Sequence, residues 1–130
     1  MTDRSATERL LHDLYAARLR GDLDGVCAAF TADAAFRITG ASSPGPMEMT
    51  ANGAEQFRPL LAMLIKTFPQ SNQRIMSMLV DGREAAVHWR VKIFSRITGT
   101  TVPTELIDMF QIRDGRISSF TELFAPIKAN

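Results

Sequence analysis

The stretch that decides the fold is residues 102–124, VPTELIDMFQIRDGRISSFTELF, in which apolar and polar residues alternate on both sides of Asp114-Gly115. Alternation of period two is typical of a β-strand with one buried face, and Asp-Gly favours the tight turn of a β-hairpin. Two earlier runs have the same period, with Asp81-Gly82 between them and Thr98-Gly99 after the second. The second half of the chain is therefore predicted to form a four-stranded antiparallel meander with strands 75–80, 86–97, 102–112 and 117–124.

The first half of the chain has helical signals. Ser5-Ala6-Thr7-Glu8 matches a capping box, so a helix is expected to start there and to end at Gly21. Asp22 can cap a second, shorter helix. A third, amphipathic helix is expected from Asn52, with Pro59 either kinking it or delaying its start.

Between the second and third helices the signals are weaker. Residues 34–39 are predicted to form a short strand, and residues 40–53 collect Gly, Pro and Ser with little periodicity. That segment is predicted to be a loop. Helices followed by a curled antiparallel sheet are typical of an α+β domain.

Composition excludes several classes of protein. The 130 residues are 45% hydrophobic and 22% charged, which fits a single globular domain over 1–130. Fifteen Lys and Arg against 14 Asp and Glu give a net charge of +1 without a basic stripe, so no nucleic-acid partner is expected. The apolar run 60–65 is far shorter than the roughly 20 residues that cross a bilayer. With one cysteine, Cys27, and no apolar leader, a cytoplasmic protein without a membrane span is expected.

Two carboxylates occur in apolar rows of the predicted strands. Asp108 shares a strand face with Leu106, Phe110 and Ile112. Glu122 shares a face with Phe120 and Phe124, although the periodicity of this last strand equally allows the opposite face to be buried. In the strand before them, one face carries Val87, Trp89, Val91 and Ile93.

A carboxyl group in apolar surroundings prefers to be neutral, which moves its pKa toward the range useful for proton transfer near pH 7. Asp108, Glu122 and the phenol of Tyr15 would form a plausible acid/base set. Ordinary structural roles also fit: a strand Asp paired with Arg, a solvated Glu, and a core Tyr with its hydroxyl in water. No metal-ligand spacing and no glycine-rich phosphate loop is present, so neither metal nor cofactor is expected.

Two stretches of the sequence are informative together. Residues 15–26 read YAARLRGDLDGV, and residues 106–110 read LIDMF and are followed by the Asp114-Gly-Arg-Ile117 string. These stretches resemble the nuclear transport factor 2-like superfamily, in particular its SnoaL-like and ketosteroid isomerase-like members. The resemblance covers almost the whole chain. It implies a cone-shaped, cystatin-like α+β fold with three N-terminal helices packed in a strongly curved, mainly antiparallel sheet. It also implies a deep apolar pocket and a homodimer paired through the sheet, on the side of His88, Arg90 and Lys92.

The resemblance carries over to single residues. Tyr15 matches the oxyanion-hole tyrosine of the isomerases and Asp108 their protonated aspartic acid, whereas Ile38 falls where they have the aspartate base. Isoleucine cannot take a proton, which disfavours steroid isomerisation by that route. Residues 116–124 resemble a strand of limonene epoxide hydrolases whose acid matches Glu122; this turns Glu122 inward, but the Arg and Asp partners needed for epoxide hydrolysis are missing.

The predicted function is therefore cofactor-independent acid/base catalysis on a small hydrophobic carbonyl or polycyclic compound, of isomerase, polyketide cyclase or hydrolase type. Tyr15 and Asp108 would stabilise an oxyanion, and Glu122 would act as base. The residues expected to line the pocket are apolar: Ile38, Trp89, Val91, Leu106, Phe110, Phe120 and Phe124. The alternatives are a non-catalytic module that binds a small hydrophobic ligand, and a structural dimer without ligand.

Overall fold

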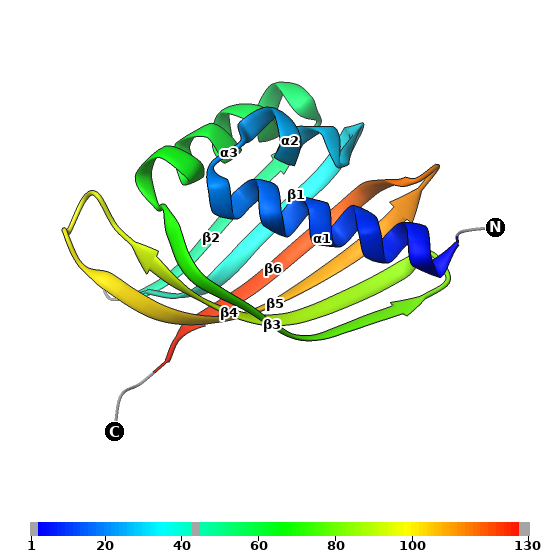
Figure 1. The fold of residues 1–130 in the computed structure, drawn as a ribbon. Coiled ribbons are helices and arrows are strands. Elements are labelled where there is room, and N and C mark those ends of the chain that lie inside the picture. Colours follow the sequence, from blue (N-terminus) through cyan, green and yellow to red (C-terminus); the bar gives the residue numbers. More distant parts are fainter. Residues whose placement is uncertain (1–2, 43–44, 128–130) are drawn as a thin grey trace.

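The computed structural model describes residues 3–42 and 45–127. Three helices lie against one face of a curved six-stranded sheet, as Figure 1 shows, so the predicted α+β class is confirmed. The elements follow in the order α1 (Arg4–Arg20), α2 (Leu23–Ala28), β1 (Phe30–Ser42), β2 (Gly45–Asn52), α3 (Ala54–Thr67), β3 (Gln70–Asp81), β4 (Glu84–Phe94), β5 (Thr101–Arg113) and β6 (Arg116–Pro126).

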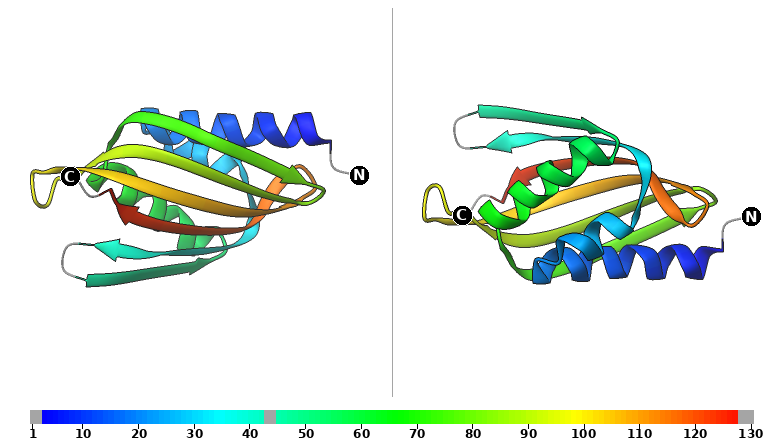
Figure 2. Two further views of the ribbon diagram at one scale, coloured as in Figure 1. Left: turned by 90° about the horizontal axis from the view of Figure 1, so that it is seen from below. Right: turned by 90° about the horizontal axis from the view of Figure 1, so that it is seen from above.

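The strands are arranged in the order β2-β1-β6-β5-β4-β3. Strands β3 to β6 form the predicted antiparallel meander, and β1 joins it by pairing parallel to β6. The two views of Figure 2 show that the helices cover only one face of the sheet. We call this the concave face and the opposite one the convex face.

The helix ends show how side chains replace missing backbone partners. Helix α1 starts before the predicted Ser5, because the side chain of Asp3 caps it by accepting from the Ser5 N–H at 3.0 Å. It ends at Gly21, whose φ of 74° is left-handed, as predicted. Asp22 caps α2 by accepting from the Gly25 N–H. Pro59 lies inside α3, which begins only two residues after the predicted start at Asn52.

The loop predicted over residues 40–53 is wrong. Strand β1 continues to Ser42, and β2 returns antiparallel to it with Ile38 opposite Met49. Glycine and proline weaken local strand signals, but pairing with β1 supplies the hydrogen bonds that make this segment a strand. Residues 43 and 44 lie outside the described residues.

The pairing register of the strands places the concave-face residues in three parallel rows, each running across the sheet. The aromatic row contains Ala85, Phe110, Phe120, Phe36 and Ala51; the acidic row contains Val87, Asp108, Glu122, Ile38 and Met49; the tryptophan row contains Trp89, Leu106, Phe124, Gly40 and Met47. Every member of the aromatic row is buried, whereas the other two rows contain half-buried residues from Glu122 and Phe124 onward, with Ile38 the buried exception. The concave face therefore has a dry end and an accessible end.

The dry end is a cluster of phenylalanines. Phe36 stacks on Phe57 of α3 with ring centroids 4.8 Å apart, and Phe110 contacts Phe120 at 5.4 Å. Phe30 lies 4.5 Å from Phe36. This apolar core holds the sheet against the helices and fixes the strands that carry the acids.

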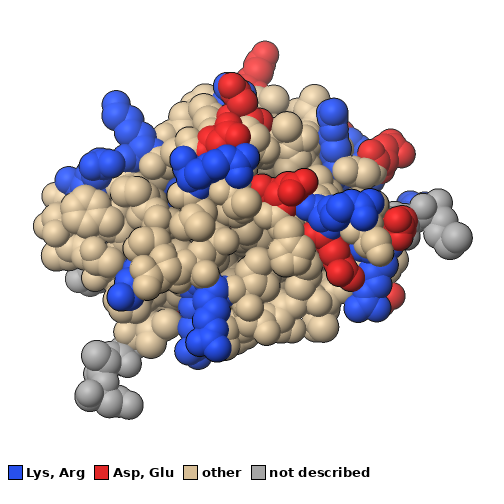
Figure 3. Space-filling view, viewed as in Figure 1, with Lys and Arg blue, Asp and Glu red and all other residues tan. Residues whose placement is uncertain are grey.

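The charged side chains on the surface are mixed, as the net charge of +1 leads one to expect. Acidic and basic side chains lie among one another in the view of Figure 3. In the part of the chain that the structure describes, no helix is long and apolar enough to cross a membrane.

Candidate active site

The acidic row brings two carboxylic acids together. Asp108 of β5 and Glu122 of β6 are directly opposite each other in the antiparallel pair, so both side chains lie on the concave face. Asp108 is 1% exposed, and Glu122 is half-buried. The inward face of β6 thus contains Phe120, Glu122 and Phe124, while Leu123 points outward and is 42% exposed.

Tyr15 of α1 completes the group. Its hydroxyl donates to Asp108 Oδ2 at 2.5 Å, and the indole N–H of Trp89 donates to the same oxygen at 2.8 Å. The Tyr15 and Trp89 rings meet edge to face with centroids 4.9 Å apart. The Gln73 side-chain amide donates to the Tyr15 carbonyl at 2.9 Å, which further fixes this part of the helix. Residues from α1, β3, β4 and β5 therefore hold Asp108 in one orientation.

The environment of Asp108 favours its neutral form. Burial, followed by the negative charge of Glu122, raises the pKa of Asp108 well above its usual range, and the bonds from Tyr15 and Trp89 only partly oppose this. Oδ2 already accepts two donors, so the proton belongs on Oδ1. Oδ1 is buried and has no hydrogen-bond partner among the described residues. The O–H of a neutral Asp108 therefore lies on the concave face, where Glu122, directly across the strand pair, is the acid that interacts with it.

Glu122 is the more readily ionised acid of the pair. Burial raises its pKa, but Asp108 and the positive charge of Arg18 oppose the rise. The pKa of Tyr15 is raised well above its usual value, first by burial and then by Asp108, so its phenol stays protonated. Tyr15 and Asp108 are therefore the more firmly protonated groups, and Glu122 is the acid that ionises first, which suits general acid/base chemistry.

Sequence reasoning did not single out Arg18. It lies one turn beyond Tyr15 on α1, and its Nη2 donates to the carbonyl oxygens of Leu64 at 3.3 Å and Phe68 at 2.9 Å. The spacing of three residues from Tyr15, within the stretch quoted above, was the available signal. The partners of Arg18 at the end of α3 come from another part of the chain.

The seven predicted lining residues all lie on the concave face. All are buried except Phe124, which is half-buried. Phe110 and Phe120 belong to the phenylalanine cluster, whereas Ile38 is the direct neighbour of Glu122 on β1. Trp89 has a polar role as well, since it donates to Asp108.

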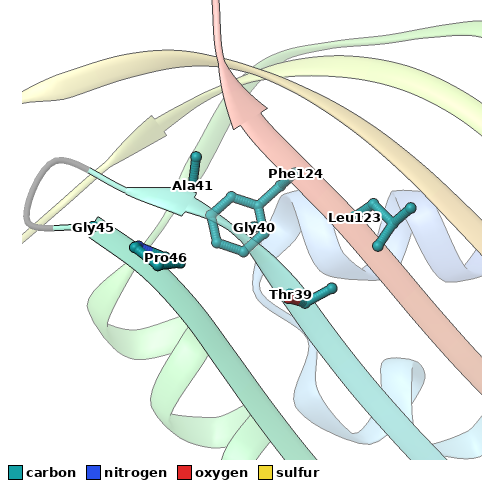
Figure 4. Close-up of a pocket in the computed structure, with 7 residues that line it drawn as sticks. All are labelled: Thr39, Gly40, Ala41, Gly45, Pro46, Leu123 and Phe124. Atoms are coloured by element: carbon teal, nitrogen blue, oxygen red, sulfur yellow. The ribbon is translucent and has the colours of Figure 1, made fainter.

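A hollow of about 420 Å³ lies where the tryptophan row reaches β1 (Figure 4). Phe124 and Gly40 contribute to its wall, together with Thr39, Ala41, Gly45, Pro46 and Leu123. A Cβ atom at Gly40 would lie 2.7 Å from the Phe124 ring and would clash with the Phe124 carbonyl oxygen, so this close approach requires glycine. A second hollow of about 430 Å³ lies at the start of α1, beside Asp3 and Arg113. Neither is lined by Tyr15, Asp108 or Glu122.

No grouping suited to a metal ion is found among residues 3–42 and 45–127, where His, Cys, Asp and Glu side chains nowhere gather in threes with the right geometry.

The fold has many counterparts among solved structures. An NTF2-like protein from Burkholderia xenovorans LB400 has a TM-score of 0.78 at 18% identity, with 96% of this chain and 93% of that chain covered. An LEH-like epoxide hydrolase from M. tuberculosis has a TM-score of 0.72 at 18% identity, covering 93% and 84%. A protein with a ketosteroid isomerase-like fold from Catenulispora acidiphila, in complex with trimethylamine, has a TM-score of 0.70 at 16% identity, covering 87% and 82%. No curated protein sequence matches the chain.

The curved sheet and its three helices therefore have the fold of nuclear transport factor 2-like proteins. Residues 11–120 match the sequence family described as the SnoaL-like domain, and the chain belongs to that family.

Proposed function

We propose that this protein is a cofactor-independent acid/base enzyme that acts on a small apolar carbonyl compound. The observation that carries the proposal is the buried, unpartnered Oδ1 of Asp108, directly across the sheet from the Glu122 carboxyl. A buried polar atom without a partner costs free energy, which a ligand oxygen would recover.

The proposed reaction starts with proton transfer from carbon. The Glu122 carboxylate takes a proton from the carbon beside the carbonyl. The C–H electron pair forms the new C=C bond, and the carbonyl π pair moves onto the oxygen. Asp108 Oδ1–H donates a hydrogen bond to this developing oxyanion, while Tyr15 and Trp89 hold Asp108 through Oδ2. Each such group lowers the barrier by about 2–4 kcal/mol. If the substrate has a neighbouring double bond, return of the proton to the far carbon of the dienolate completes an isomerisation. Attack of the enolate on a second carbonyl, with return of the proton from Glu122 to the new alkoxide, completes a cyclisation.

The position of Ile38 supports Glu122 as the base. Ile38 matches the place of the isomerase aspartate but is apolar and buried. Its direct neighbour across the β1–β6 pair is Glu122. A carboxylate is thus available one strand away, and the apolar side chains of Trp89, Leu106 and Phe124 in the adjoining row favour an apolar substrate.

Proton exchange tests the proposal without knowledge of the natural substrate. The α-hydrogens of 2-tetralone and related apolar ketones would be followed by NMR in D₂O. We expect Glu122→Gln to slow protein-catalysed exchange about 10²–10⁴-fold, because it removes a general base. Glu105→Gln, a matched change on the convex face, should leave the rate unchanged. Equal rates for the wild-type protein and Glu122→Gln would reject the assignment.

The second candidate is a binding module without chemistry, and Ile38 is the observation that favours it. Such a module would bind the same apolar ketones through Asp108. If Asp108→Asn weakens ketone binding and no bound ketone exchanges its α-hydrogens, the protein is a binding module.

We also propose that the protein is a cytoplasmic homodimer paired through the convex face. Large apolar side chains are exposed there, among them Ile107 at 44% and Met109 at 54%. Exposed apolar patches of this kind mark association surfaces. Ile107→Lys should halve the mass found by analytical ultracentrifugation, whereas Arg4→Lys should not; a wild-type monomer would contradict the dimer.

A further inference from the structure

Arg18 is a charged side chain with unused donors beside the acid pair. A guanidinium has five N–H donors, and both of the hydrogen bonds that Arg18 makes use Nη2. In the described part of the chain, Nε and Nη1 have no hydrogen-bond partner, and Arg18 takes part in no ion pair. Two neutral carbonyl oxygens therefore hold a partly buried cation in place without neutralising it.

Nε and Nη1 of Arg18 are not among the buried atoms without a partner, so they are open to water or to a negative group that approaches. A guanidinium withdrawn from water loses hydration, and hydrogen bonds to uncharged carbonyls compensate for only part of the loss. Burial lowers the pKa of Arg18, and Glu122 is the acidic group whose charge opposes this. Glu122 lies opposite Asp108 across the sheet and forms no ion pair with Arg18 among the described residues. The remaining donors of Arg18 are thus available to an anion that comes from outside.

Gln70 supplies a second, independent sign of a missing partner on the same side of the sheet as the helices. It is opposite Ile93 in the β3–β4 pair, on the concave face, and only two residues after Phe68, whose carbonyl binds Arg18. Gln70 Oε1 is buried without a hydrogen-bond partner among the described residues. Since a half-turn of a carboxamide exchanges its oxygen and NH₂, Gln70 can offer a ligand either an acceptor or a donor.

We propose that Arg18, assisted by Gln70, binds a carboxylate of the ligand, so that the substrate is an apolar compound with an enolisable carbonyl at one end and a carboxylate at the other. This inference rests on the proposed function, because Asp108 and Glu122 are taken to hold the carbonyl end. A singly charged carboxylate fits better than a phosphate dianion, since Arg18 is one cation with the negative Glu122 near it.

The test uses ligands that resemble the enolate at one end and differ only at the other. A phenol mimics an enol, so 6-hydroxy-2-naphthoate and 4-hydroxybenzoate would be compared with their methyl esters by isothermal titration calorimetry. In each pair, the phenol of the methyl ester is more acidic than the phenol of the carboxylate. Tighter binding of the carboxylate therefore cannot come from the phenol end. Two lengths are used because the ligand must reach from Asp108 to Arg18.

We expect the wild-type protein to bind at least one acid ten-fold or more tightly than its ester. Arg18→Gln should remove this preference and leave ester affinity within two-fold, which also shows that the variant is folded. Arg18→Lys should restore part of the preference, and Gln70→Met should reduce it two- to five-fold. If the esters bind in a way that requires Asp108 but neither carboxylate binds more tightly than its ester, the carboxylate site is overturned and the proposed function stands. If no phenol of either kind binds, the proposed function fails and the carboxylate site fails with it.

Discussion

Glu105 and Asp108 lie three residues apart on β5 and face opposite sides of the sheet. On the convex face, Glu105 accepts from His88 at 2.8 Å and from Arg90 at 3.2 Å, and these hydrogen bonds, His88 first, lower its pKa. On the concave face, burial raises the pKa of Asp108 well above its usual range. One strand thus carries a stable carboxylate outside and a neutral acid inside, which shows that the surroundings and not the residue type decide what a carboxyl group can do.

The largest difference between the faces should be in packing. Phe120→Ala removes a side chain from the phenylalanine cluster and should lower the free energy of unfolding by about 3–5 kcal/mol. Leu123→Ala, on the convex face of the same strand, should cost less because Leu123 is 42% exposed and lies outside the phenylalanine cluster. Urea denaturation of both variants measures this. Equal losses would mean that another molecule covers the convex face.

The pH dependence of stability should have opposite signs on the two faces. Above about pH 4 the unfolded chain releases the proton of Asp108, while the folded protein retains it. Folding is therefore weakened as pH rises, by about 1.4 kcal/mol for each pH unit over which only the folded state holds the proton. Relative to the wild-type protein, Asp108→Asn should become more stable from pH 4 to pH 8, measured by urea denaturation at each pH. A difference independent of pH would show that Asp108 is ionised in the folded protein.

Tyr15→Phe should have a smaller effect on stability. Asp108 Oδ2 keeps its bond from Trp89, so the loss of one hydrogen bond should cost about 1 kcal/mol. Because the Tyr15 bond favours the ionised form of Asp108, its removal should raise the pKa of Asp108 further. Carboxyl titration by NMR, with Asp108→Asn for assignment, checks the direction. A lower pKa would contradict the hydrogen-bond pattern.

The smallest effect is expected for Glu105→Gln. The lowered pKa of Glu105 gives a stabilising contribution that is present above about pH 4.3 and is lost as pH falls through its folded value. The group is exposed, so the loss in the variant should be small and should disappear in 1 M salt. Thermal denaturation at pH 7 and pH 3, with and without salt, tests this. A salt-independent loss would indicate that Glu105 is covered by a partner.

Much of the fold was predictable because its signals are local. The period-two pattern and the Asp-Gly turns predicted strands β3 to β6, and Asp22 was recognised as a helix cap. The same alternation placed Asp108 in an apolar row, and the structure buries it. Strand β2 was missed because the Gly and Pro residues around its start indicated a loop, although Met47, Met49 and Ala51 alternate with polar residues as in a strand.

The candidate site depended on contacts between distant parts of the chain. Alternation by itself left the buried face of β6 open, and the pairing of β6 with both β1 and β5 turned Glu122 inward. Tyr15 is 93 residues from Asp108 in sequence, yet its hydroxyl occupies one oxygen of that acid and leaves the other without a partner. The sequence by itself determined which residues could exchange protons. Only the tertiary structure decided which of them holds a proton, because that choice depends on burial and on hydrogen bonds contributed by other elements.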